Sequence, residues 1–260
     1  MHRLGLCYDG TPATLDAILE IYQLPHLTIT GTYTHYAVAD SLSPDDIAYT
    51  KQQYHFFQEL IAILKEKHIS TGILHTQNTP ATLHYSDFKC DYVRTGTLLL
   101  DIPYGDIALS PQAQLFKSIF SLKSKISIVK TLPPNAKISY GLNYTTSQTQ
   151  RIAVVAIGYG DGYPRYLSNR QVHVIINGTL AKVIGNICMD QLIIDVTSIP
   201  DVKEGDTVTL IGSSDGYTIS LDYIAQMMNT VSNEIVDHIN PRVPRVYTKG
   251  KEAFIKFLIF

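Results

Sequence analysis

Tyr159 stands in a glycine-broken loop that could present a phenol for proton transfer. The loop, residues 158–162 (GYGDG), follows a β-rich run from 151 to 157. Glycines on both sides of a tyrosine let the backbone turn sharply and leave the phenol accessible. A phenol has an ordinary pKa of about 10, so it acts as a general base only where cations or hydrogen-bond donors stabilise its anion. The pattern therefore predicts either such a base or a tyrosine at an ordinary strand end.

Three other polar side chains lie at or near the ends of predicted strands: His35, His75 and Arg94. In α/β barrels the functional residues gather at the C-terminal ends of the strands. We therefore expect these three side chains at one end of a barrel, where they would form a site. The alternative for each is a strand-end polar group that faces solvent.

The elements that must position these residues change character near residue 118. Before it, helices (12–22, one opening at Ser43-Pro44, and 80–85) alternate with strands (27–36, 72–76 and 91–100). Ser43 suits a helix cap and Pro44 the first helical position. The second helix carries a stripe at helical spacing, which predicts one buried face: Ile47, Thr50, Tyr54, Phe57, Ile61 and Leu64. This alternation predicts parallel βα units.

After residue 118 the pattern is that of a β-rich domain. Strands are predicted over 126–129, 137–140, 152–157, 172–176, 181–184, 192–196 and 207–211. Asn177-Gly178 is a hairpin signal, and one helix, 221–228, is capped by Ser220. We therefore predict two domains, 1–118 and 119–260.

Composition excludes several classes of function. The net charge is −2 and the chain has no basic run, so nucleic-acid binding is not expected. No apolar run reaches 18 residues, so no membrane span is expected. The three cysteines are widely spaced, which favours reduced thiols in a cytoplasmic protein over a disulfide framework or a metal site.

A series of motifs, in order along the chain, resembles the alanine racemase family. They are 1–5 (MHRLG), 34–40 (THYAVAD), 75–79 (HTQNT), 93–96 (VRTG), 139–141 (SYG), 157–165 (IGYGDGYPR), 188–191 (CMDQ) and 242–247 (RVPRVY). The resemblance implies pyridoxal 5′-phosphate (PLP)-dependent interconversion of L- and D-alanine, which supplies D-alanine for peptidoglycan. It implies the second half of a TIM-type (β/α)8 barrel over 1–118 and a C-terminal β domain carrying the tyrosine base over 119–260.

The resemblance also implies roles for individual residues. Tyr159 would be the base on the L-alanine face, and it would reach the partner subunit's site in a homodimer. Arg94 would face the pyridine nitrogen of PLP and keep it unprotonated, because an arginine does not release its proton. His35 would bridge Arg94 towards the tyrosine.

Further positions match cofactor and substrate contacts of the family. Five would hold the cofactor, the last four at its phosphate: His75, Asn78, Thr79, Gly96 and Thr97. Arg3 and Met189, the latter through its backbone, would hold the substrate carboxylate, with Asp190 beside them. Asp40 matches a residue that lines the access channel.

The chain also departs from the family pattern. The family's N-terminal segment, which carries the Schiff-base lysine in a Lys-x-x-x-Tyr-Gly pattern, has no match here. We expect that lysine from a separate N-terminal fragment. Asn186 replaces a family arginine, and Asn233 replaces a family tyrosine. Two alternatives remain open: an inactive remnant, such as a β-domain dimerisation module, and a racemase of another small amino acid such as serine.

Overall fold

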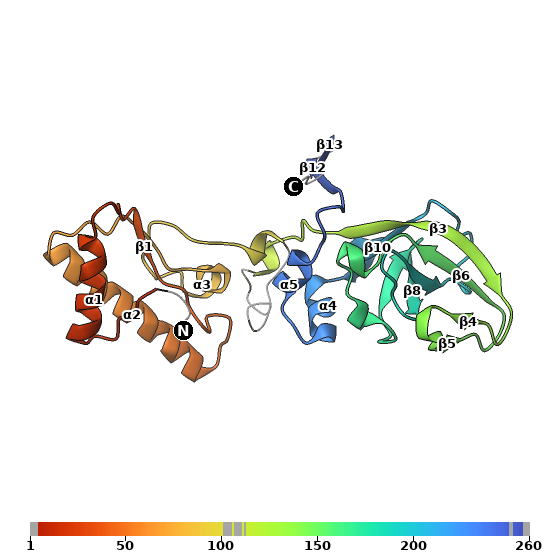
Figure 1. Cartoon of the computed structure of the whole chain (residues 1–260), viewed down its shortest axis with the longest axis horizontal. Helices are drawn as coiled ribbons and strands as arrows, with labels where there is room; N and C mark the ends of the chain where they lie inside the picture. The colour runs from red at the N-terminus through yellow and green to blue at the C-terminus, as the bar shows by residue number, and fades with distance from the viewer. Residues whose placement is uncertain (1–4, 101–105, 107–110, 112, 250–251, 257–260) are drawn as a thin grey trace. The chain divides into compact units, whose positions relative to one another are not determined.

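The computed structural model describes residues 5–100, 106, 111, 113–249 and 252–256. The chain divides into two compact units, Met1–Ser118 and Ile119–Phe260. Figure 1 colours the first from red to yellow and the second from green to blue.

The first unit contains a parallel βαβ arrangement. Its elements are α1 (Pro12–Gln23), β1 (Gly31–Tyr33), α2 (Pro44–Glu66), β2 (Ile73–His75) and α3 (Thr79–His84). Strands β1 and β2 pair in parallel, with Tyr33 opposite His75. Parallel neighbours need a crossover connection, and α2 provides it. The predicted alternation is confirmed, although the strand expected over 27–36 is regular only in β1.

Helix α2 begins as the sequence predicts. The Ser43 hydroxyl accepts a hydrogen bond from the backbone N–H of Asp46 (3.2 Å), and Pro44 occupies the first turn. Most of the predicted stripe is buried, and Ile47 and Tyr54 are half-buried. The apolar part of this face packs with α1 into a cluster of Ile18, Phe57, Leu60, Ile61 and Leu64.

The prediction of a strand over 91–100 is wrong. The structure shows only an isolated parallel bridge between Asn78 and Arg94, followed by a 3-10 turn, η1 (Thr97–Leu99). Gly96 precedes this turn with φ −116° and ψ −78°, which ends the extended run. A later 3-10 turn is η3 (Ala113–Leu115).

The second unit is built on a closed antiparallel sheet. Its strands are β3 (Leu122–Leu132), β6 (Gln150–Val155), β7 (His173–Ile176), β8 (Thr179–Ile184), β9 (Leu192–Asp195), β10 (Thr207–Ser214) and β11 (Tyr217–Ile219). The order is β11-β10-β3-β6-β9-β8-β7, and β10 also pairs with β7. That last pairing closes six strands into a small barrel. Fully buried side chains such as Val155, Leu192 and Leu210 form its core.

Smaller elements complete the second unit. The predicted hairpin turn at Asn177-Gly178 is confirmed, because both residues have positive φ (45° and 66°) between β7 and β8. Helix α4 (Leu221–Met228) is capped by Ser220 as predicted. The strand predicted over 137–140 is regular only in β4 (Lys137–Ile138), which pairs with β5 (Tyr144–Thr145).

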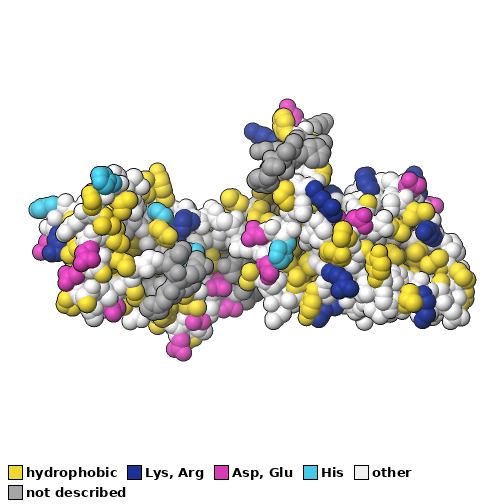
Figure 2. Space-filling model, in the orientation of Figure 1, with side chains coloured by type: hydrophobic (Ala, Val, Ile, Leu, Met, Phe, Trp, Pro, Cys, Tyr) yellow, Lys and Arg dark blue, Asp and Glu magenta, His cyan; other side chains and the backbone are white. Residues whose placement is uncertain are grey.

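The sequence pattern did not predict β11, helix α5 (Ser232–Asp237) or β12 (Arg245–Lys249). Strand β12 pairs with β13 (Glu252–Lys256), which overlaps the apolar tail from residue 254. Three 3-10 turns are η4 (Tyr140–Leu142), η5 (Tyr159–Asp161) and η6 (Arg165–Leu167). Within the described ranges, no helix is long and apolar enough to cross a membrane. Figure 2 shows hydrophobic side chains interspersed with Lys and Arg on the visible face of this unit.

Candidate functional site

In the first unit, the side chain of Arg94 contacts residues at the C-terminal ends of both β1 and β2. Its Nη1 lies 2.7 Å from the His75 Nδ1 and donates to the His75 carbonyl (2.7 Å). Its Nη2 donates to the carbonyls of Thr34 (2.9 Å) and Thr76 (3.2 Å) and lies 3.3 Å from the His35 Nδ1. The structure thus brings together three residues that the sequence only placed near strand ends.

The contact of Arg94 with His75 determines the hydrogen-bonding state of that histidine. A guanidinium has donors and no acceptor, so the His75 Nδ1 at 2.7 Å must accept from it. His75 is therefore assigned as a neutral ring with the proton on Nε2. Burial, and then the Arg94 charge, lower the pKa of His75 below its ordinary value. Burial also lowers the pKa of Arg94, and a guanidinium stays charged at neutral pH.

The aromatic ring of Tyr33 completes this group. It is stacked on the His75 imidazole, with ring centroids 5.1 Å apart and planes 5° apart. The guanidinium carbon of Arg94 lies 5.2 Å from the centroid of the same ring. The sequence pattern did not indicate Tyr33, although this aromatic residue lies two positions before His35 in the predicted strand 27–36. We call Tyr33, His35, His75 and Arg94 the arginine cluster.

Close to the arginine cluster, two loops meet through polar groups. The backbone N–H of Gly96 donates to the Thr79 hydroxyl (3.1 Å), and Arg94 donates its backbone N–H to the Gln77 carbonyl (2.8 Å). The Asn78 side chain caps α3 by accepting from the Ala81 N–H (3.1 Å). A Cβ added at Gly96 would have no neighbour within 4 Å. Four predicted cofactor residues therefore lie along two joined loops, with open space at the glycine.

Thr97 carries a buried hydroxyl that has no hydrogen-bond partner among the described residues. A buried hydroxyl without a partner is costly, and such a group indicates either strain or an additional polar partner. Asp40 is half-buried in the same unit. Arg3 lies outside the described residues.

In the second unit, the loop around Tyr159 pairs with the segment that contains Met189. The backbone N–H of Tyr159 donates to the Cys188 carbonyl (3.0 Å), and that of Gly160 donates to the Met189 carbonyl (2.7 Å). The side chains of Tyr159 and Met189 are 42% and 58% exposed. Asp190 is also exposed. The predicted base and the predicted carboxylate contacts are thus adjacent through the backbone.

Asp161 holds this loop, which we call the tyrosine turn (residues 158–163). One carboxylate oxygen accepts from the Gly158 N–H (2.9 Å) and the other accepts from the Arg242 Nε (2.8 Å). The Asp161 carbonyl accepts from the backbone N–H of Asn240 (3.0 Å). The sequence analysis gave no role to Asp161 or Arg242, although both lie inside the quoted motifs. No signal in the sequence joins them, because they lie 81 residues apart.

At two positions of the tyrosine turn, any side chain would clash with neighbouring backbone, so only glycine fits. A Cβ on Gly158 would lie 2.2 Å from the Cys188 carbonyl oxygen, and one on Gly162 would lie 2.2 Å from that of His238. Gly162 also has φ 102°, a conformation that side chains disfavour. The turn therefore packs directly against backbone on both sides.

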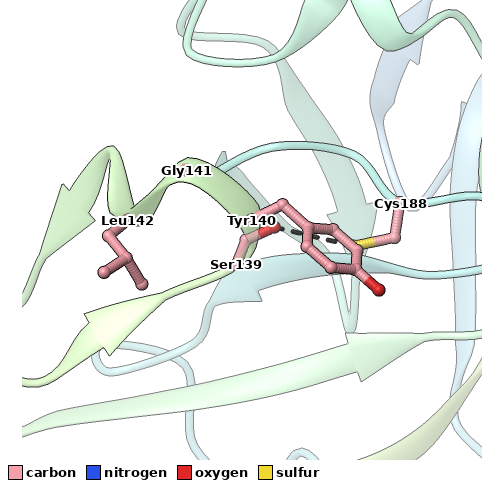
Figure 3. A pocket seen from close by; sticks show the side chains of 5 residues that line it. All are labelled: Ser139, Tyr140, Gly141, Leu142 and Cys188. Atoms are coloured by element: carbon pink, nitrogen blue, oxygen red, sulfur yellow. Dashed lines mark hydrogen bonds between the residues drawn. The ribbon is translucent and has the colours of Figure 1, made fainter.

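A shallow pocket of about 450 Å³ adjoins the same segment, lined by Ser139, Tyr140, Gly141, Leu142 and Cys188. Figure 3 shows the Ser139 hydroxyl facing the Cys188 sulfur, at 3.6 Å. The amide of Asn186, which replaces a family arginine, donates to the Tyr140 carbonyl (2.7 Å) and accepts from Asn169 (3.0 Å). Asn186 thus ties together the loops around the pocket. Among the described residues, no group of three or more His, Cys, Asp or Glu is placed to hold a metal ion.

Sequence profiles of one family cover both units. The profile for the alanine racemase N-terminal domain matches residues 1–102, and that for the C-terminal domain matches residues 119–247. The alanine racemase of Halothermothrix orenii is 39% identical over 88% of this chain and 59% of its own length. The chain spans about three fifths of the length of the curated relatives it matches.

Solved structures agree with the profiles. Alanine racemase from Clostridium difficile 630 matches with a TM-score of 0.88 and 32% identity, over 100% of this chain and 65% of that one. Alanine racemase from Bartonella henselae, with covalently bound pyridoxal phosphate, matches with a TM-score of 0.72 and 25% identity, over 92% of this chain and 61% of that one. The fold is thus that of the later barrel strands and the β domain of these enzymes. On these matches and on the motifs in both units, the chain belongs to the alanine racemase family.

Proposed function

We propose that this chain contributes a PLP-dependent site that interconverts L- and D-alanine. The observation that carries the proposal is the arginine cluster, in which a permanent cation is held by backbone carbonyls beside the rings of His35 and His75. When bound, PLP supplies an electron-withdrawing ring that stabilises negative charge at the substrate's α-carbon. The structure of the Bartonella henselae relative, which contains this cofactor, supports the choice.

The donors of Arg94 fit a pyridine nitrogen. Its two terminal nitrogens already contact the His75 and His35 rings and three carbonyls. In the described part of the chain, the Nε–H of Arg94 donates to no protein acceptor, so it is the N–H left for a ligand. A guanidinium cannot give up a proton to the pyridine nitrogen. Arg94 would therefore hold the ring by hydrogen bonding while leaving it unprotonated, which restrains its electron withdrawal and favours racemisation over side reactions.

The phosphate would lie against the two joined loops. The hydroxyls of Thr79 and Thr97 can donate to it, Asn78 stands at the start of α3, and the open side of Gly96 admits an anion close to the backbone. The Thr97 hydroxyl has no hydrogen-bond partner among the residues that the structure describes, so it is available as a donor at this position. The residues present therefore fit a phosphate group.

Proton transfer on the L-alanine face would fall to Tyr159. Its ring is accessible, and the tyrosine turn holds its backbone against Cys188 and Met189. We propose that Met189, through its backbone, and Asp190 border the substrate carboxylate, and that Arg3 binds it. His35, which contacts Arg94, would hydrogen-bond towards the Tyr159 phenol and so help to stabilise its anion. This requires Tyr159 from a second copy of the chain, so the functional form would be a homodimer.

The lysine that carries PLP would be supplied by residues outside these 260. No lysine here stands in a Lys-x-x-x-Tyr-Gly pattern. We propose that a segment carrying the family's Lys-x-x-x-Tyr-Gly pattern, on the same polypeptide or on another, is the source. The exposed apolar side chains of the first unit, such as Leu27, Ile73 and Leu99, are consistent with a surface that such a segment would cover.

The proposal is tested by following α-proton exchange of L-alanine in D₂O with added PLP, from the chain alone and from the chain co-expressed with its upstream coding region. We expect exchange only in the second sample. Loss of exchange by about 10²–10⁴-fold is expected in Tyr159→Phe, the range for removal of a general base.

Tyr166→Phe is the matched control, because Tyr166 is a comparably exposed tyrosine (53%) that contacts Arg170 in the next turn. It should leave exchange unchanged. Soluble protein without exchange in either sample would refute the enzyme and favour the inactive remnant. Faster exchange with L-serine than with L-alanine would instead assign another substrate.

A further inference from the structure

We propose that Tyr33 is a positioning residue, whose ring fixes the orientation of the His75 imidazole and so holds the Arg94 guanidinium in the arrangement described above. Tyr33 and His75 are register partners on parallel strands, so their side chains leave the sheet on the same face. Their rings lie 5.1 Å apart and within 5° of parallel, an offset stack.

The stack matters because the His75 ring must present one particular nitrogen. Nδ1 lies 2.7 Å from Nη1 of Arg94 and must accept from it. A ring flipped by 180° about its Cβ–Cγ bond would place the Cδ2–H group where Nδ1 now lies, and Nη1 of Arg94 would lose this acceptor. In-plane donation from Arg94 selects the correct orientation. A flat ring against the imidazole face blocks rotation out of that plane.

Tyr33 also contacts the cation directly. The guanidinium carbon of Arg94 lies 5.2 Å from the centre of the phenol ring, within the range of a cation–π interaction. One ring therefore covers both partners of the hydrogen bond between His75 and Arg94. The phenol hydroxyl has no part in either contact, so the aromatic face is what acts. Tyr33→Phe should preserve the function of the residue and Tyr33→Leu should not.

The consequence for chemistry follows from the donors of Arg94. Both hydrogens of Nη1 are used by the ring and the carbonyl of His75, and this contact holds the guanidinium so that its Nε–H faces a ligand. A His75 ring free to rotate would release Nη1 and let the guanidinium turn. The role of Tyr33 in aligning this donor for a pyridine nitrogen rests on the function proposed above. The role of Tyr33 in orienting the His75 ring does not depend on that function.

The test uses histidine labelled with ¹⁵N in the full chain, without cofactor or substrate. The nitrogen shifts report the tautomer of His75, and a pH titration reports its pKa. The His75 signals are assigned from a His75→Gln sample. Arg94 is the charge that contacts His75, and the Asp91 carboxylate accepts from the neighbouring Leu74 N–H, so both groups are kept unchanged. His173, in the second unit, is the internal control.

We expect a single Nε2–H tautomer for His75 in the wild type and in Tyr33→Phe, with equal pKa values. In Tyr33→Leu we expect a mixture of tautomers and a pKa that rises towards the ordinary histidine value, because burial and the fixed contact with Arg94 are both relaxed. The ¹⁵N signals of His173 should be the same in all samples.

A single tautomer and a wild-type pKa in Tyr33→Leu would overturn the proposal. So would equal shifts in Tyr33→Phe and Tyr33→Leu, which would assign the effect to the hydroxyl. If Tyr33→Leu does not fold by circular dichroism, Tyr33→Met keeps the bulk without an aromatic face and decides the question. Because the readout needs no PLP, racemisation could be absent while this result stands, and the two failures are distinguishable.

Discussion

Substitution of Gly158 by alanine should destabilise the second unit and displace the proposed base. A Cβ at this position would meet the Cys188 carbonyl oxygen at 2.2 Å and the Met189 carbonyl carbon at 2.5 Å. Ordinary contact begins near 3.4 Å, so backbone must move by about 1 Å. Both obstacles are main-chain atoms, and no side-chain rotation relieves the clash.

The magnitude follows from what that movement breaks. Overpacking costs about 1–3 kcal/mol. Two backbone hydrogen bonds, from Tyr159 and Gly160 to the carbonyls of 188 and 189, stand to be lost at about 0.5–1.5 kcal/mol each. We therefore expect Gly158→Ala to lower the free energy of unfolding by about 2–6 kcal/mol, a large part of the stability of a typical domain.

Urea unfolding followed by circular dichroism measures this change, and the absence of tryptophan makes circular dichroism preferable to fluorescence. Hydrogen exchange of the amides of Tyr159 and Gly160 locates it. Gly96→Ala is the matched control: Gly96 also has negative φ, but nothing lies within 4 Å of its added Cβ. It should change stability by less than about 1 kcal/mol. A Gly158→Ala variant with the wild-type midpoint and unchanged exchange would refute the steric reasoning.

Two further predictions follow from buried polar groups. The pKa of His75 is lowered in the folded state, so the contribution of the neutral His75 ring to stability is complete above the unfolded pKa of about 6.5 and is lost as the pH falls from there through the folded pKa. The urea midpoints of the wild type and of His75→Gln should therefore converge on acidification. A difference between the two midpoints that does not depend on pH would contradict this reasoning. Tyr163 is fully buried, its hydroxyl has no partner among the described residues, and burial raises the pKa of its phenol; Tyr163→Phe should leave the thermal midpoint unchanged or raise it, and a clear drop would reveal a hidden partner for the hydroxyl.

The sequence by itself determined the elements that local chemistry specifies. Helix α2 begins where Ser43 and Pro44 place it, and the hairpin turns at Asn177-Gly178, because these signals act over a few residues. The family was also readable, since its motifs are short and contiguous. The six strands of the closed barrel were predicted for the same reason, as their apolar alternation is local.

Only the tertiary structure decided how separate motifs meet. Arg94 was predicted on a strand, but it lies in a single bridge, where its side chain reaches carbonyls of residues 34 and 76. Pairing of Asp161 with Arg242 joins positions 81 residues apart, and the closure of the barrel by β10 and β7 depends on strand order. Contacts of this kind depend on how the backbone brings distant segments together. A local pattern contains no information about which distant carbonyl, ring or carboxylate a side chain will find.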